Sequence, residues 1–254
     1  MSTTVILSPH FDDGVLSCGG RIWAARQRGA AVRVLTLFGG MPRGEVPPFA
    51  QVQHAMWGSP PAPNQLRRAE DVAAHTRLGC FDVHHLDALD AVYRVAKDGR
   101  SLYGSEEGIF GDIQPEEAEY ASELMEMVRP LLPANATVLA PLGAGHHVDH
   151  QLSHVVGRSL LEEGWSVGFY EELPYIEQPA ALARALEGKA TWHLATLPLS
   201  EEAMAAKVAA AAYYRTQIPV LFGDDLSMSR RLRAVASDAA GGKGYAERVW
   251  WSDT

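Results

Sequence analysis

Short apolar runs alternate along the chain with longer stretches that place apolar residues on one helical face. The continuous run Val5–Leu7 lies inside a strand expected over Thr4–Ser8, which is typical of a strand covered on both faces. A helix is expected over Ser17–Gln27, closed by Gly29, because glycine accepts the left-handed conformation at a helix end. This opening indicates a strand followed by a covering helix.

The alternation continues through most of the chain. Further strands are expected over Val32–Phe38, Val83–Leu86, Thr137–Pro141, Val167–Tyr170 and Thr191–Leu197. Further helices are expected over Leu66–Leu78, Glu116–Leu132, His150–Glu163 and Glu201–Gln217. Strands that alternate with helices predict the α/β class, with a mostly parallel sheet flanked by helices. No linker divides the chain, so we expect a single domain over residues 1–254.

Two segments interrupt this pattern. Met41–Gln65 contains six prolines, so no regular element is expected to run through it. Val95–Gln114 is rich in glycine and polar residues. Long loops inside a compact domain are usually functional rims or lids, and we expect these two to frame the entrance to a site.

Composition narrows the classes of function. The net charge is −9, and no run of Lys or Arg forms a cationic stripe, which argues against nucleic acid or anionic lipid as a partner. The N-terminus lacks the pattern of a signal peptide, and no window approaches the roughly 18 apolar residues that span a bilayer. Cys18 and Cys80 form no CxxC pair and are expected to be buried thiols. We therefore expect a cytoplasmic protein, with the oligomeric state open, a homo-oligomer included.

The first stretch with candidate chemistry is Ser8–Asp13, directly after the first strand. Open parallel sheets bind ligands at the carboxyl ends of their strands, so an active site is expected here. His10, Asp12 and Asp13 next to an apolar strand are costly unless they are paired or bound to a metal. Taken alone, the stretch is equally compatible with a surface turn in which an aspartate caps the next helix.

The second stretch is Gly145–His150, which again follows an apolar strand and holds three of the ten histidines. Alone it is also compatible with a polar helix start. Together, however, the two stretches are expected to lie side by side at one edge of the sheet. Two histidines and one carboxylate would give a catalytic zinc its three protein ligands and leave a position for water. A further carboxylate could act as a base and a further histidine as an electrophile.

The segments His10-Phe11-Asp12-Asp13 and His147-Val148-Asp149-His150 resemble the paired motifs of the LmbE-like, or PIG-L, deacetylase family. The resemblance extends over most of the chain, because further similar segments are Arg67–Glu70 with Leu78–Gly79, Leu86–Arg94, Tyr170–Tyr175 and Lys207–Phe222. The resemblance implies a Rossmann-like α/β fold. It also implies hydrolysis of N-acetyl groups on N-acetylglucosamine units of glycolipids, of mycothiol and bacillithiol precursors, or of glycopeptide antibiotics.

The resemblance further implies zinc as the cofactor and a small-molecule amino sugar or glycoconjugate as the substrate. The implied zinc ligands are His10, Asp13 and His150. Asp12 is implied to be the general base towards the zinc-bound water. His147 is implied to stabilise the oxyanion, with Asp149 orienting it. Arg67 and Asp90 are implied to bind sugar hydroxyls.

The chain also departs from the family pattern. Gly14 replaces the acidic residue that usually follows the two aspartates, and Gly145 stands where some members carry a mobile tyrosine. Glu171 and Glu172 match a family segment near the pocket, although an acidic surface loop explains them nearly as well. These differences leave the substrate and the oxyanion donors open.

Three other functions are compatible with the same residues. The first is an amidase that acts on a larger thiol or natural-product conjugate. The second is a non-haem iron oxygenase, because two histidines and one carboxylate are also its ligand set. The third is a metal-binding or sugar-binding module without turnover, against which Asp12 and His147 argue because binding alone needs neither.

Overall fold

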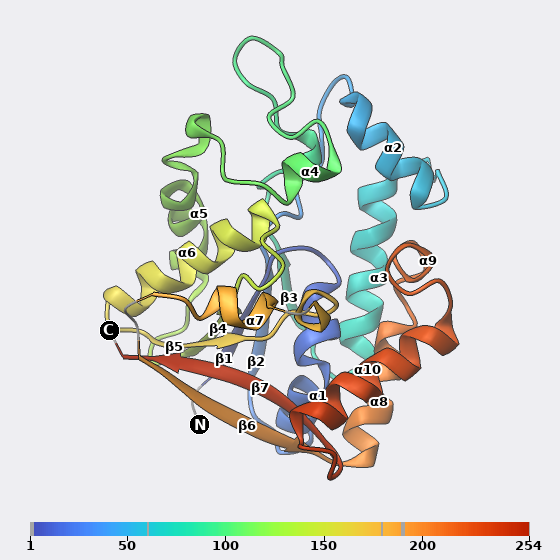
Figure 1. Cartoon of the computed structure of the whole chain (residues 1–254), viewed down its shortest axis with the longest axis vertical. Coiled ribbons are helices and arrows are strands. Elements are labelled where there is room, and N and C mark those ends of the chain that lie inside the picture. Colours follow the sequence, from blue (N-terminus) through green and yellow to red (C-terminus); the bar gives the residue numbers. More distant parts are fainter. Residues whose placement is uncertain (1–2, 60, 179, 189–190, 254) are drawn as a thin grey trace.

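The computed structural model describes residues 3–59, 61–178, 180–188 and 191–253, and it contains one seven-stranded sheet with the order β3-β2-β1-β4-β5-β7-β6 (Figure 1). The strands are β1 (Thr4–Ser8), β2 (Val32–Thr36), β3 (Asp82–His85), β4 (Thr137–Pro141), β5 (Ser166–Tyr170), β6 (Trp192–Leu199) and β7 (Tyr245–Ser252). The first five strands are parallel, whereas β7 runs antiparallel to both β5 and β6. The predicted class, a mostly parallel α/β sheet, is confirmed.

Helices cover both faces of the sheet. They are α1 (Asp13–Gln27), α2 (Pro48–Met56), α3 (Pro63–Arg77), α4 (Glu106–Ile109), α5 (Tyr120–Val128), α6 (Val148–Glu162), α7 (Ala181–Ala185), α8 (Glu201–Ala211), α9 (Ile218–Leu221) and α10 (Asp225–Ala239). In Figure 1, α1, α3, α8 and α10 lie on one side of the sheet and α5 and α6 on the other. Within the described residues, no helix is long and apolar enough to cross a membrane.

The apolar run in β1 is divided between the two faces. Ile6 packs in the cluster that includes residues of α1, α8 and α10, whereas Val5 and Leu7 pack with residues of α5 and α6. All three side chains are fully buried. This explains why the strand shows an unbroken apolar run, since side chains alternate between two covered faces.

The strand order reverses between β1 and β4, which pair with each other in parallel. From β1 the chain proceeds to β2 and β3 on one side, whereas β4 is followed by β5 on the other. Such a switch point opens a crevice at the carboxyl ends of the two strands, where ligands bind in folds of this kind. The stretches that follow Ser8 and Pro141 both begin at this point, as the sequence predicts.

Several predicted elements were wrong in extent. The Pro-rich segment does contain a helix, α2, in which Pro47 lies at the N-cap and Pro48 at the first helical position. Proline is tolerated there because the first turn leaves its N–H groups unbonded. The helix predicted over Glu116–Leu132 is reduced to α5, flanked by 3-10 turns that contain Pro115 and Pro130.

The C-terminal part departs furthest from the prediction. The helix expected over Glu201–Gln217 ends at Ala211, and neither α10 nor β7 was predicted. Strand β7 inserts between β5 and β6, and Trp250 pairs with Phe169 of β5. A strand inserted between partners far away in sequence depends on tertiary pairing, which local periodicity does not register.

Candidate active site

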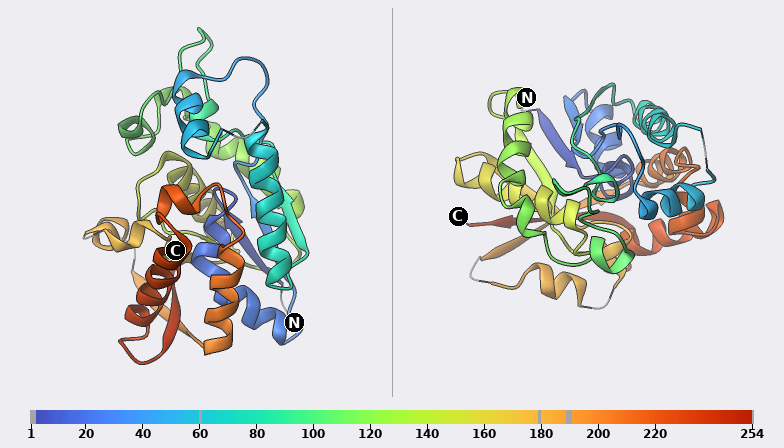
Figure 2. Two further views of the ribbon diagram at one scale, coloured as in Figure 1. Left: turned by 90° about the vertical axis from the view of Figure 1, so that its right-hand side faces the viewer. Right: turned by 90° about the horizontal axis from the view of Figure 1, so that it is seen from above.

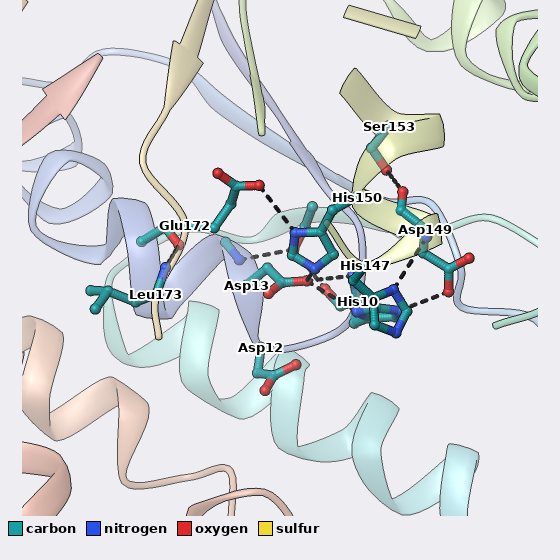
Figure 3. Close-up of polar contacts among 12 residues, drawn as sticks. His10, Asp12, Asp13, His147, Asp149, His150, Ser153, Glu172 and Leu173 are labelled. Atoms are coloured by element: carbon teal, nitrogen blue, oxygen red, sulfur yellow. Dashed lines mark hydrogen bonds and ion pairs between the residues drawn. The ribbon is translucent and has the colours of Figure 1, made fainter. Parts of the chain in front are cut away.

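The turn after β1 is held by its own hydrogen bonds. The Ser8 hydroxyl donates to the carbonyl oxygen of His10 at 2.6 Å and accepts from the backbone N–H of Gly14 at 2.8 Å. The backbone N–H of His10 donates to Asp13 Oδ2 at 2.8 Å. Because the bonds close a tight turn at the start of α1, the side chains of His10 and Asp13 face the same point (Figure 3).

The three residues expected to hold a metal come together at this point. Asp13 Oδ2 lies 3.3 Å from His10 Nδ1 and 3.2 Å from His150 Nε2. One potential ligand atom from each residue lies within 4.8 Å of the other two. His150 Nε2 is buried and has no hydrogen-bond partner among the described residues. An orphaned ring nitrogen facing a carboxylate and a second imidazole fits a divalent cation, and two His with one Asp suit zinc.

The opposite nitrogen of each imidazole meets a carboxylate. His10 Nε2 lies 2.9 Å from Asp149 Oδ2, and His150 Nδ1 lies 3.3 Å from Glu172 Oε1. Carboxylates in this position fix the tautomer and the orientation of ligating histidines. Both histidines therefore present one nitrogen to the shared centre while a buried acid holds the other.

Glu172 was not assigned to the site from the sequence. Its side chain is fully buried, and it accepts hydrogen bonds from the backbone N–H groups of Leu142, Gly143 and Ala144. It thus ties the loop after β4 to the segment after β5, with His150 between them. The available signal was its position two residues after an apolar strand, but the acidic pair Glu171-Glu172 is equally typical of a solvated loop.

Asp149 occupies a different place from the one expected. Its carboxylate contacts His10, the backbone N–H of Ala91 at 3.0 Å, and the guanidinium of Arg94. Asp149 bonds to His147 only through its backbone N–H. In this structure its carboxylate does not hydrogen bond to the His147 ring. His10, His147 and Asp149 form a second potential metal group, but Asp149 is already held by Arg94, which makes it a support for His10. Arg94 was missed as a site residue.

His147 lies at the N-cap of α6. The backbone N–H of Asp149 donates to His147 Nδ1 at 3.2 Å, so the neutral ring carries its proton on Nε2. Burial, together with the neighbouring His10 and His150, lowers the pKa of His147 well below its ordinary value. The ring lines a cavity, and a neutral Nε2–H group there can donate a hydrogen bond.

The adjacent aspartates are in opposite electrostatic states. Burial and the charge of Asp13 raise the pKa of Asp12 to about 6. Burial by itself would raise the pKa of Asp13, but the charges of His150 and His10 and the hydrogen bonds with both rings together lower that pKa well below its ordinary value. In Figure 3 Asp13 points into the histidine rings, whereas Asp12 is turned away from them. Asp12 is thus free of the potential metal centre and faces the cavity.

Arg67 and Asp90, expected to bind sugar hydroxyls, both line the same cavity. Arg67 approaches Asp12 at 3.6 Å and Asp90 at 3.8 Å, distances too long for hydrogen bonds. Its guanidinium stacks over the ring of Trp57 at 4.5 Å. This stacking holds the guanidinium in place while N–H groups remain available to a ligand.

The cavity has a volume of about 370 Å³ and opens above these residues. Its walls come partly from the two segments that interrupt the sequence pattern, through Phe49 of α2 and Phe110 beyond α4. Residues of α2, α4 and α9 line the cavity, and Figure 2 shows α2 and α4 at the same end of the molecule. A cavity of this size accepts a small ligand such as a sugar.

The ring of Tyr175 packs against Gly145, the position where some family members carry a tyrosine. A Cβ atom on Gly145 would lie 2.2 Å from Tyr175 Cγ, so only glycine allows the ring to pack there. The ring meets that of His150 edge-on, with 5.0 Å between centroids, and Tyr175 lines the cavity. A phenol is therefore present near the position where some family members carry a tyrosine, but it comes from a different segment.

Comparisons with known proteins identify the family of the chain. The family model PIG-L, described as GlcNAc-PI de-N-acetylase, matches residues 5–161. A 2'-N-acetylparomamine deacetylase from Niallia circulans is 30% identical over 249 residues, with 92% of this chain and 88% of the relative covered. A second protein of that name from Streptomyces fradiae is 32% identical over 194 residues, covering 70% of this chain and 60% of its own length.

Solved structures point the same way. The zinc-inhibited form of teicoplanin deacetylase Orf2 superposes with a TM-score of 0.83 at 29% sequence identity, covering 99% of this chain and 98% of that chain. The family match includes both motif stretches at the switch point, and the structural match extends over nearly the whole chain. The chain is a member of the PIG-L family of N-deacetylases.

Proposed function

We propose that this enzyme uses zinc to remove the acetyl group from the nitrogen of an amino sugar within a natural-product intermediate. The observation that carries the proposal is the convergence of His10, Asp13 and His150, each imidazole backed by a buried carboxylate, beside a sugar-sized cavity that His10 and Asp13 line. The relatives named for N-acetylparomamine and teicoplanin support an amino sugar as the acetylated group.

When bound, zinc would supply Lewis acidity and lower the pKa of a coordinated water from 15.7 to about 7. Asp12 accepts a proton from the attacking water and returns it to the leaving amine, since amide nitrogen leaves poorly unless protonated. The Nε2–H of His147 donates to the negative charge that develops on the acetyl carbonyl oxygen as water attacks the carbon. Arg67 and Asp90 hydrogen bond the sugar hydroxyls and place the amide beside Asp12.

The test is a mass-spectrometric screen of N-acetylated amino sugars and their glycosides with zinc-loaded enzyme. We expect loss of an acetyl group, release of acetate and no requirement for oxygen. Turnover that depends on oxygen and iron would instead support the oxygenase. An enzyme that is loaded with zinc and hydrolyses none of these amides would overturn the proposal.

Glu172→Gln is expected to weaken zinc affinity by about 10- to 100-fold, because the amide no longer supplies the charge that holds His150 Nδ1–H. Competition with a chromophoric chelator measures the affinity. Glu171→Gln is the matched control: its side chain accepts from Trp250 Nε1, away from His150, and zinc affinity should stay unchanged. Equal affinities of the two variants would show that Glu172 does not support His150.

We also propose that the Tyr175 hydroxyl is a second hydrogen-bond donor to the developing oxyanion. Tyr175→Phe is then expected to lower kcat by about 10²-fold and to retain zinc, as when one oxyanion donor is lost. Gly145→Ala should lower kcat as well, because its Cβ would displace the Tyr175 ring. The exposed Tyr213→Phe variant serves as control. Unchanged kcat in Tyr175→Phe would remove the hydroxyl from the mechanism.

A further inference from the structure

The cavity is divided into a charged floor and an apolar rim. Apolar side chains that line the cavity come from α2, α4 and α9 and from the segments beside them, which are far apart in sequence. We call this set the apolar rim: Phe49, Val52, Met56, Ile109, Phe110, Val220 and Leu221. An amino sugar alone offers these side chains little, because its surface is mostly hydroxyl groups.

Two members of the apolar rim are strongly exposed. Val52 and Met56 are 55% and 50% accessible, and both belong to α2. They lie one helical turn apart, so they share a face, and both line the cavity. Exposed apolar side chains next to a binding cavity indicate a surface that an apolar part of the ligand contacts.

The positions of the charged side chains around the cavity indicate which kinds of ligand fit it. The buried charged groups of the cavity, Asp12, Asp13 and Asp90 with Arg67, belong to its floor. Glu106 is the one exposed charged side chain among the described residues that line the cavity. A ligand that carries several ammonium groups beyond the reacting sugar would need several carboxylates at the mouth, and the rim offers apolar surface instead.

We propose that the apolar rim binds an aromatic or otherwise apolar aglycone, to which the reacting amino sugar is attached. The assignment rests on the proposed function, because the sugar must occupy the floor for its aglycone to reach α2 and Phe110. The aglycone covers Val52 and Met56 from water, while the sugar keeps its contacts with Arg67 and Asp90.

The first test measures binding of the deacetylated products, which needs no turnover. The zinc-loaded enzyme is titrated by calorimetry with methyl β-glucosaminide and with 4-methylphenyl β-glucosaminide. Burial of one aromatic ring predicts binding of the aryl glycoside at least about tenfold tighter. Equal affinities would overturn the inference, as would tighter binding of a pseudo-oligosaccharide with several free amines than of the aryl glycoside.

Variants of the apolar rim test whether the aglycone binds there. In Val52→Ser/Met56→Gln, the ratio of aryl to methyl affinity is expected to fall to about threefold or less. The matched control is Val72→Ser/Leu226→Gln, since Val72 and Leu226 are also exposed, at 47% and 58%, but do not line the cavity. Its ratio should equal that of the unaltered enzyme. A ratio that persists in the α2 double variant would show that the aglycone lies elsewhere.

The two proposals can fail separately. The corresponding N-acetyl glycosides are incubated with the same zinc-loaded enzyme, and acetate release is measured. Tight aryl binding without acetate release from either glycoside would reject the proposed reaction and leave the apolar rim standing. Release from both glycosides with equal affinities and equal kcat/KM would support the reaction and reject the rim.

Discussion

Asp12→Asn is expected to keep its zinc and its fold and to lower kcat by about 10²- to 10⁴-fold, the usual range for a lost general acid–base group. The carboxylate is turned away from the histidine rings and faces the cavity, so its removal leaves the potential metal centre intact. Steady-state kinetics on a substrate from the screen, with metal content measured on the same sample, checks both statements.

The pH profile gives a second readout. Burial and the charge of Asp13 raise the pKa of Asp12 to about 6. A base works only when it is deprotonated, so activity of the unaltered enzyme should fall as the pH drops through that value. Asn at this position does not titrate there, and the profile of Asp12→Asn should lose this acidic limb.

Asp13→Asn is the matched comparison, since it makes the same chemical change at the neighbouring residue. It should act through metal affinity, and excess zinc should restore part of its activity, because Asp13 Oδ2 faces both His10 and His150. Added zinc should do nothing for Asp12→Asn. If the two variants behave alike, or if zinc rescues Asp12→Asn, the assigned roles are exchanged or both carboxylates are ligands.

His150→Ala is expected to purify with little or no zinc and with no measurable activity. Three protein ligands leave no redundancy, and the His150 ring supplies the buried nitrogen that has no other partner within the described part of the chain. Metal analysis after gel filtration tests this, alongside the unaltered enzyme, which should hold about one zinc per chain and lose activity reversibly on chelation.

The control for this variant lies one turn further along the same helix. His154 is bonded through Nδ1 to the carbonyl oxygen of Pro141 at 3.1 Å, and it takes no part in the ligand cluster. His154→Ala should therefore keep its zinc. Full zinc occupancy in His150→Ala would refute the ligand assignment, whatever its activity.

The local pattern of the sequence determined the frame of the fold and the position of the site. The apolar runs of β1 and β4 mark buried parallel strands, since both of their faces are covered. The polar stretches after Ser8 and Pro141 stand at strand ends, and a parallel sheet brings such ends to one edge. The spacing of His10 and Asp13 places both in one tight turn, so this half of the site is a local property.

Only the tertiary structure decided which groups surround these residues. Asp12 and Asp13 are chemically identical, and their different directions arise from the turn and from His150, which belongs to the distant helix α6. Glu172 and Arg94 hold the site through contacts across many residues of sequence. The periodicity of the local sequence does not reveal such long-range pairs, because packing of distant segments determines which side chains are buried and which groups they contact.

The same limit applies to β7 and α2. The sequence of β7 has strand-forming residues, but its place between β5 and β6 depends on pairing with distant strands. In α2, the prolines that suggest a loop in fact occupy a helix start, where the missing N–H group costs little. The sequence by itself therefore determined the parallel strands and the two motifs rich in His and Asp. Packing decided the supporting acids, the inserted strand and the apolar rim, because those depend on contacts between segments far apart in the chain.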